Sequence, residues 1–279
     1  MHIAHMKRPM LAATARELAD IWLPCAATPK IDGIRCVTTT AGALTRAFKP
    51  VPNRHIFQLV SQLQPGLDGE LVSGDFNATQ SAVMSRDGEP HFVYVVFDQF
   101  GSAGYWERVH SLPELPAFCQ PLLPTVCHTL QQLQAFEESC VEAGYEGIMT
   151  RHAHGRYLEQ RATLRSQLLV KFKRFVDSEA RVVGFTEGST NANQLEADAF
   201  GYAKRSGHSA GKVPRGTLGS LEAVDVHTGA RVSVAGLDEA TRAEVWADQN
   251  TYLGCLFKYR YQHAAGCAPR FPRFIAWLV

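Results

Sequence analysis

The stretch Ala27-Thr-Pro-Lys-Ile-Asp-Gly-Ile-Arg35 places Lys30 at a fixed spacing from Asp32, Gly33 and Arg35. A lysine amine becomes a nucleophile when neighbouring cations or desolvation lower its pKa. A solvated surface lysine is the ordinary alternative. Four fixed positions recur by chance at on the order of one in 10^5 sites, so this stretch needs support from the rest of the chain.

Carboxylates recur further along the chain. Asp68 and Glu70 lie two apart in the predicted strand Leu67–Val72, so they share one face, where a divalent cation would relieve their repulsion. Glu146 follows a predicted helix over Leu130–Ala143 and would add a third carboxylate. The ordinary alternatives are a turn with solvated acids and a loop glutamate.

Of two further motifs, one contains an aromatic residue and the other contains two lysines. Phe97 ends a predicted strand over Phe92–Phe97, where its ring could stack on a purine or pack in a core. Lys171 and Lys173 share one face of a predicted strand over Leu168–Phe175, which suits a polyphosphate. Lysines that guard a strand edge are the alternative.

In this order and spacing, the five motifs resemble motifs I, III, IIIa, IV and V of the covalent nucleotidyltransferases. The chain most resembles the minimal ATP-dependent DNA ligases, nearly from end to end. The stretches that carry this resemblance are Pro9–Thr14, Ala27–Arg35, Arg46–Pro50, Thr79–Met84, Phe200–Ser206, Gly211–Val213 and Pro269–Pro272.

The resemblance implies a DNA ligase that seals 3′-hydroxyl/5′-phosphate nicks with ATP and Mg²⁺ or Mn²⁺, in replication, repair or recombination. Lys30 would take the AMP, with Arg35, Lys171 and Lys173 as further catalytic residues. The remaining nucleotide-binding residues would be Thr28, Glu70, Phe97, Glu146 and Arg161. The metal ligands would be Asp68, Glu70 and Glu146. The contacts to nicked duplex DNA would come from Arg46, Lys49, Lys204, Arg205, Lys212 and Arg215.

The resemblance and the residue pattern together predict two domains. An α/β nucleotidyltransferase (ATP-grasp-like ligase) domain would cover residues 1–176, beginning with a short amphipathic segment over Arg16–Trp22. An all-β OB-fold domain would cover 177–279, with a DNA-clamping latch inserted at about 189–218. The expected strands of the second domain are Ala180–Phe185, Leu218–Val226, Arg231–Val234 and Leu253–Tyr261.

Composition narrows the class of protein. The net charge is only +1, yet Gly201 to Ser220 contains Lys204, Arg205, Lys212 and Arg215 and no acidic residue, which indicates a defined phosphate-contacting surface. No apolar run approaches the ~20 residues that span a bilayer, and no secretory signal is evident. Seven cysteines without a Cys-x-x-Cys pair fit a reducing compartment. We therefore expect a cytoplasmic monomer without an obligate protein partner.

One position departs from the ligase pattern. Leu278 stands where the resemblance predicts a motif VI arginine, which serves the first step of the reaction; Arg270 or Arg273 could substitute, or self-adenylylation could be slow. Three alternatives to a DNA ligase remain open. They are an RNA ligase, another polynucleotide nucleotidyltransferase such as a capping enzyme, or a ligase-derived nucleic-acid-binding protein with impaired self-adenylylation.

Overall fold

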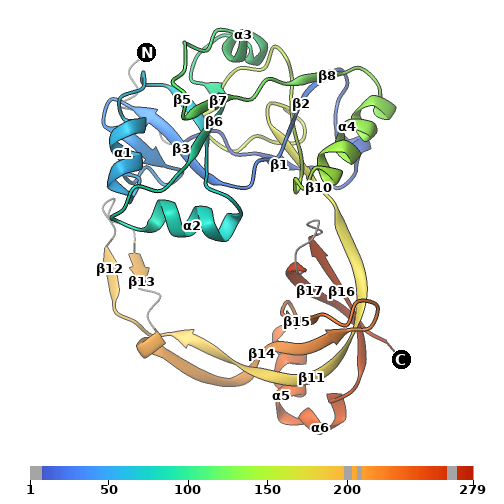
Figure 1. Ribbon diagram of the computed structural model, residues 1–279. Helices are drawn as coiled ribbons and strands as arrows, with labels where there is room; N and C mark the ends of the chain where they lie inside the picture. Colours follow the sequence, from blue (N-terminus) through green and yellow to red (C-terminus); the bar gives the residue numbers. More distant parts are fainter. Residues whose placement is uncertain (1–7, 198–202, 206–208, 263–268, 279) are drawn as a thin grey trace. The chain divides into compact units, whose positions relative to one another are not determined.

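The computed structural model describes residues 8–197, 203–205, 209–262 and 269–278, with only the backbone at 195–197 and 203–205. The chain divides into two compact units that meet between Lys173 and Arg174, close to the predicted domain boundary. Figure 1 labels their helices and strands. No helix among the described residues is long and apolar enough to cross a membrane.

The first unit contains two five-stranded sheets. One has the order β1-β10-β9-β2-β8, in which β1 and β10 are parallel and the other pairs antiparallel. Its strands are β1 (Ala13–Thr14), β10 (Val170–Lys173), β9 (Gly147–Arg151), β2 (Cys25–Pro29) and β8 (Thr125–Cys127). Met149 on β9 pairs with both Thr28 and Lys171, so three motifs adjoin across this sheet.

The second sheet has the order β4-β3-β5-β6-β7. Its strands are β4 (Gly42–Thr45), β3 (Ile34–Thr39), β5 (Leu67–Val72), β6 (Val93–Gln99) and β7 (Cys119–Pro121). The predicted strand Leu67–Val72 is confirmed. Arg35 pairs with Glu70, and Asp68 with Asp98, which brings motifs I, III and IIIa side by side.

Four α-helices cover the first unit: α1 (Arg54–Val60), α2 (Phe76–Met84), α3 (Tyr105–His110) and α4 (Leu130–Glu142). The predicted helix at α4 is confirmed: Thr129 and Gln132 form a capping box at its start, and Gly144 follows its end with φ +89°. The predicted Arg16–Trp22 segment is only one 3-10 turn, Leu18–Asp20, because the Asp20 carboxylate accepts the Arg16 and Glu17 amides and closes it locally.

The strands of each sheet point alternate residues in opposite directions. Ala27, Ile148 and Val170 lie in a buried cluster with Leu133 of α4. On the other sheet, Cys36, Leu71 and Val96 lie in a separate cluster with residues of α1 and α2. The neighbours of these residues along each strand therefore face the opposite way, and several of them carry the motifs.

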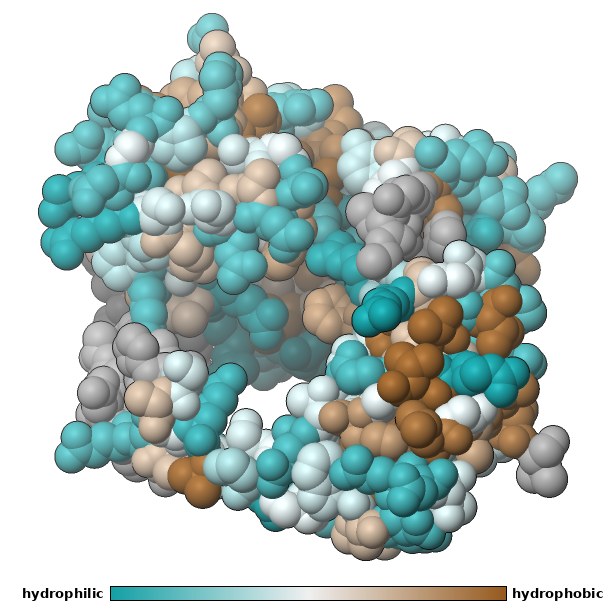
Figure 2. All heavy atoms as spheres, turned by 60° about the horizontal axis from the view of Figure 1, so that its bottom comes forward, coloured by the Kyte–Doolittle hydropathy of each residue, from teal (hydrophilic) through white to brown (hydrophobic). Residues whose placement is uncertain are grey.

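The second unit is a five-stranded β-structure of order β15-β14-β11-β16-β17. Its strands are β11 (Phe175–Asn191), β14 (Lys212–Asp225), β15 (Arg231–Val234), β16 (Leu256–Gln262) and β17 (Arg270–Trp277). The Phe274 amide donates to the Ala235 carbonyl (2.8 Å), which joins the two edges of the sheet into a barrel around a core that includes Leu221, Phe257 and Tyr259. Figure 2 shows hydrophobic side chains on the face of this unit that carries β17, where Phe271 and Ile275 are exposed.

The second unit differs from the predicted strands in several ways; one is that no strand was predicted at β17 (Arg270–Trp277). β16 begins at Leu256 rather than Leu253, because Gln249–Tyr252 (α6) and its C-cap Leu253 belong to a helical turn. A second helix, α5 (Glu239–Ala247), was not predicted; Asp238 caps it by accepting the Thr241 amide.

The predicted latch segment contains a β-ribbon. β11 and β14 continue their pairing beyond the barrel, with Ser189 opposite Pro214 and Asn191 opposite Lys212. Beyond it, β12 (Leu195–Ala197) and β13 (Ala203–Arg205) pair antiparallel. The segment is thus a hairpin extension of the barrel strands β11 and β14, and β12 and β13 form a separate two-stranded ladder within it.

Candidate active site

A cleft of about 470 Å³ lies in the first unit, and residues of both its sheets line it. Thr28, Met149 and Lys171 contribute from one sheet, and these are the neighbours of the core residues Ala27, Ile148 and Val170. The other sheet contributes Arg35, Glu70 and Phe97. The remaining charged residues of the lining are Lys30, Arg46, Arg151 and Arg161. The period of two in the strands therefore gathers residues of motifs I, III, IIIa and V around one cavity.

Lys30 follows β2 directly, and its amide donates to the Gly147 carbonyl at 2.9 Å. Its Nζ lies 2.6 Å from Oε2 of Glu146, and the Nζ of Lys173 lies 2.6 Å from the same oxygen. The side chain of Lys30 remains 21% exposed at the cleft, whereas Glu146 is buried. One carboxylate thus holds two lysines, one of which is the nucleophile that the sequence predicts.

Lys171 and Lys173 are perturbed by their surroundings. Burial and the charge of Lys30 lower the pKa of both Lys171 and Lys173. Burial alone would raise the pKa of Glu146, but the charges and hydrogen bonds of Lys30 and Lys173 hold that pKa below its ordinary value. The site is therefore an arrangement of closely spaced cations with one ionised carboxylate among them, which favours a polyanion.

Two motif glycines are required by close backbone approach. A Cβ at Gly33 would lie 2.5 Å from the Leu71 carbonyl oxygen, and one at Gly147 would lie 2.2 Å from the Phe172 carbonyl oxygen. Gly147 also has φ +143°, which side-chain-bearing residues rarely adopt. Because neither glycine has a side chain, the backbone beside Lys30 and Glu146 can pack closely against the neighbouring strands.

Arg35 is bound by Asp68 through two hydrogen bonds of 2.5 Å, from Nε to Oδ1 and from Nη2 to Oδ2. Asp68 is fully buried, and the Tyr157 hydroxyl also donates to its Oδ2 at 2.6 Å. Asp68 is one of the predicted metal ligands; in this structure its carboxylate is paired with Arg35, and its metal role stays a prediction.

Glu70 has a different environment. Burial raises its pKa to about 7, against the opposing charges of Arg35 and Lys30, and its Oε2 has no hydrogen-bond partner among the described residues. Within the described part of the chain, no group of three or more His, Cys, Asp or Glu converges, so the predicted trio of Asp68, Glu70 and Glu146 is not a preformed cage. Mg²⁺ commonly uses only one or two carboxylates together with substrate phosphates, and the unpartnered oxygen of Glu70 fits such a site.

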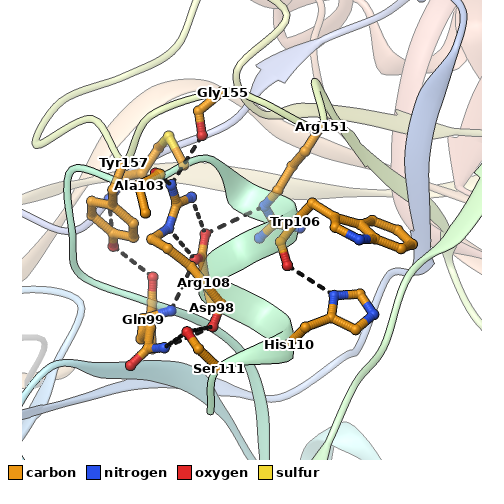
Figure 3. A network of polar contacts seen from close by, with 12 residues as sticks. Asp98, Gln99, Ala103, Trp106, Arg108, His110, Ser111, Arg151, Gly155 and Tyr157 are labelled. Atoms are coloured by element: carbon orange, nitrogen blue, oxygen red, sulfur yellow. Dashed lines mark hydrogen bonds and ion pairs between the residues drawn. The ribbon is translucent and has the colours of Figure 1, made fainter.

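Phe97 lines the cleft at 8% exposure, and two guanidinium groups lie over its ring, that of Arg35 at 4.9 Å and that of Arg151 at 5.4 Å from the centroid. Its neighbour Asp98 is fully buried and accepts hydrogen bonds from Arg108 at 2.8 and 3.1 Å. Arg151 Nε lies 3.6 Å from the same carboxylate. Figure 3 shows these groups converging between β6 and α3. This network anchors Arg151, one of the two arginines that lie over the ring of Phe97.

Sequence reasoning assigned Asp98 no role and did not single out Arg108, Arg151 or Tyr157. Asp98 directly follows Phe97 of motif IIIa in the sequence, and this adjacency was the available signal. The arginines and the tyrosine carry no local pattern, because their partners lie on other elements.

The basic residues predicted to bind DNA occupy several places. Arg46 lines the cleft itself. Lys49 lies beyond β4, and its carbonyl accepts the Thr45 amide. Lys212 is exposed at the start of β14, and Arg215 pairs with Glu239 at 2.7 Å. Lys204 and Arg205 lie on β13, where only the backbone is described. Arg161 donates to the Ala12 carbonyl at 2.7 Å at the edge of the cleft.

Comparison with known proteins identifies the class. No protein-family model and no curated protein matches the chain. Among solved structures, the Chlorella virus DNA ligase-adenylate is 30% identical, with 98% of this chain and 99% of that chain covered and a TM-score of 0.57. A second structure of that ligase-adenylate is likewise 30% identical, with coverage of 98% and 100% and a TM-score of 0.56. A Lig E DNA ligase is similar in fold, at 19% identity, 96% and 98% coverage and a TM-score of 0.69.

These neighbours confirm the predicted fold class, a nucleotidyltransferase domain followed by an OB-fold domain. The protein is thus a ligase of the nucleotidyltransferase superfamily. Within it, the chain belongs to the family of minimal ATP-dependent DNA ligases.

Proposed function

We propose that this protein is an ATP-dependent DNA ligase that seals nicks between a 3′-hydroxyl and a 5′-phosphate in duplex DNA. The observation that carries the proposal is the position of Lys30 Nζ in a cleft with Lys171, beside Glu146 and Lys173. Lys30 attacks the α-phosphorus of ATP, a nitrogen–phosphorus bond forms, and pyrophosphate leaves. The AMP then passes to the 5′-phosphate of the nick, and the 3′-hydroxyl displaces it.

The residues of the cleft have roles that follow from their placement. Lys30 must be neutral to attack, and Glu146 Oε2, at 2.6 Å, is the nearest acceptor for its proton. Lys171 and Arg161 in the lining provide positive charge for the phosphates, with Lys173 beside them at Glu146, and Thr28, Met149 and Phe97 form the walls for the base. Bound Mg²⁺, held by Glu70 and the phosphates, would neutralise charge as it develops on phosphorus.

The first experiment incubates the protein with ATP labelled at the α-phosphate, or with labelled GTP, and resolves the protein on a denaturing gel. Label from ATP that survives denaturation, and its loss in Lys30→Ala, are the expected results. Label retained by Lys30→Ala would refute the assignment of the nucleophile, and label from GTP alone would point to a capping-type enzyme.

The second experiment supplies duplex substrates with a single 5′-phosphorylated nick. Sealed product from an all-DNA nick, and little from an RNA nick, supports the DNA ligase. Leu278, whose amide donates to the Leu256 carbonyl at 2.9 Å, stands at the motif VI position. Sealing of a pre-adenylylated nick without sealing from ATP would place a defect in the first step, and no reaction with either substrate would favour a nucleic-acid-binding protein.

A further inference from the structure

Tyr157 belongs to none of the five motifs, yet it contacts Asp68, the carboxylate that holds the cleft residue Arg35. It lies between β9 and β10, and its hydroxyl donates to Asp68 Oδ2 at 2.6 Å. The same hydroxyl accepts the Met10 amide at 3.1 Å. The proton and a lone pair of the hydroxyl are thereby directed by fixed partners.

These bonds form a closed ring with Arg35. Asp68 accepts two hydrogen bonds from Arg35, and Arg35 Nη2 also reaches the Met10 carbonyl at 3.3 Å. Arg35, Asp68, Tyr157 and Met10 are thus linked in a cycle in which each member touches the next. Of the four, Arg35 and no other lines the cleft.

Burial makes this ring rigid. Asp68 and Met10 are almost completely buried, and the Arg35 side chain is 14% exposed. The Tyr157 ring packs edge-on against Phe100 at 4.8 Å between centroids, and the Arg108 guanidinium lies 5.6 Å from it. Figure 3 shows Tyr157 beside Arg108. The Tyr157 ring is therefore held by packed neighbours, which keeps its hydroxyl oxygen beside Asp68.

We infer that Tyr157 is a positioning residue for catalysis: through Asp68 it fixes the guanidinium of Arg35, which lines the cleft over the ring of Phe97. The inference rests on the proposed function. Without the hydroxyl, Asp68 Oδ2 keeps only its bond from Arg35, so the carboxylate and the guanidinium can rotate together. A small displacement of a charged group that lines the reaction cleft is enough to slow the reaction strongly.

The chain offers a matched control. Tyr259 in the second unit donates its hydroxyl to the buried Asp225 Oδ2, also at 2.6 Å, and does not line the cleft. Tyr157→Phe and Tyr259→Phe therefore remove the same kind of bond from a buried carboxylate. We expect Tyr157→Phe to slow single-turnover formation of the lysyl-AMP adduct at saturating ATP by about tenfold or more, while Tyr259→Phe stays near the wild-type rate.

A double-mutant cycle separates positioning from a general loss of structure. Arg35→Lys keeps the positive charge but cannot make the two-pronged bond to Asp68. If Tyr157 acts through Arg35, then Tyr157→Phe adds little further loss in the Arg35→Lys protein. Thermal unfolding of every variant is recorded, and rates are measured well below the lowest transition.

Each outcome decides the inference. Multiplying losses in the double variant, or a Tyr157→Phe protein as fast as the wild type, would overturn it while leaving the proposed function intact. A wild-type protein that forms no AMP adduct under any condition would overturn both. Equal slowing by Tyr157→Phe and Tyr259→Phe would assign the effect to general destabilisation and reject positioning.

Discussion

The Nζ atoms of Lys30 and Lys173 lie at the same distance, 2.6 Å, from the same oxygen of Glu146. A single carboxylate therefore sets the separation of the two lysines. Because Glu146 also precedes Gly147, whose backbone packs against β10, its position is fixed by the strand and not by the lysines.

Glu146→Gln should lower the rate of lysyl-AMP formation on the order of a hundredfold, because Lys30 loses the charged group that aligns it and this carboxylate no longer offsets the repulsion among the lysines. Single-turnover labelling with ATP measures this rate. Glu142→Gln, which changes an exposed carboxylate at the end of α4, is the control and should match the wild type. An unchanged rate in Glu146→Gln would show that this carboxylate neither aligns Lys30 nor takes its proton.

Glu70 gives the free protein a distinctive pH dependence. Burial raises its pKa to about 7 from an ordinary value of 4.5. Between these values the folded state binds more protons than the unfolded state, so the contribution of Glu70 to stability falls as the pH rises through this window. The free energy of unfolding of Glu70→Gln, compared with that of the wild type, should therefore increase between pH 5 and pH 8 by on the order of 2 kcal/mol.

Urea unfolding of the nucleotide-free protein at several pH values measures this difference. The Glu142→Gln variant again serves as the control, since its exposed carboxylate should give a curve parallel to the wild type. Parallel curves for Glu70→Gln as well would mean that Glu70 titrates at its ordinary pH in the folded protein.

The buried ion pairs around Asp98 predict a large effect on stability. Asp98→Asn leaves Arg108 and Arg151 buried without the counter-charge of this carboxylate. The free energy of unfolding should fall by about 3–5 kcal/mol, which is typical when one partner of a buried ion pair is removed. Asp177→Asn breaks a pair with Arg260 near the surface and should cost at most about 1 kcal/mol. Denaturant titration compares the two; similar losses would mean that the Asp98 network contributes no more than a surface pair.

The sequence predicted those parts of the fold that have local patterns. The strand Leu67–Val72, the strand Arg231–Val234 and the helix at α4 follow from alternation and from capping residues. By contrast, α5 contains the single buried side chain of Val245, so its apolar periodicity is too weak to mark a helix.

The candidate site was predictable to a similar degree. Lys30, Arg35, Glu70, Phe97 and Lys171 do line one cleft. The partner of each charge was not predictable: a carboxylate such as Asp68 can bind a metal or an arginine, and spacing along a strand is the same in both cases. The structure shows the partners of Asp68 in this state, Arg35 and Tyr157, and the metal role of Asp68 stays a prediction.

The hairpin formed by β12, β13 and the outer parts of β11 and β14 predicts a salt-dependent contribution to DNA affinity. Replacing Lys204, Arg205 and Lys212 by glutamine should weaken binding to nicked duplex and make the slope of log K against log salt shallower by roughly 0.9 for each phosphate that the hairpin no longer neutralises. Arg54→Gln, on α1 and paired with Asp87, is the control and should leave the slope unchanged. Fluorescence anisotropy at several salt concentrations measures it. Unchanged affinity and slope in the triple variant would exclude the hairpin from the DNA interface, because the number of ions released on binding must fall when fewer phosphates are neutralised.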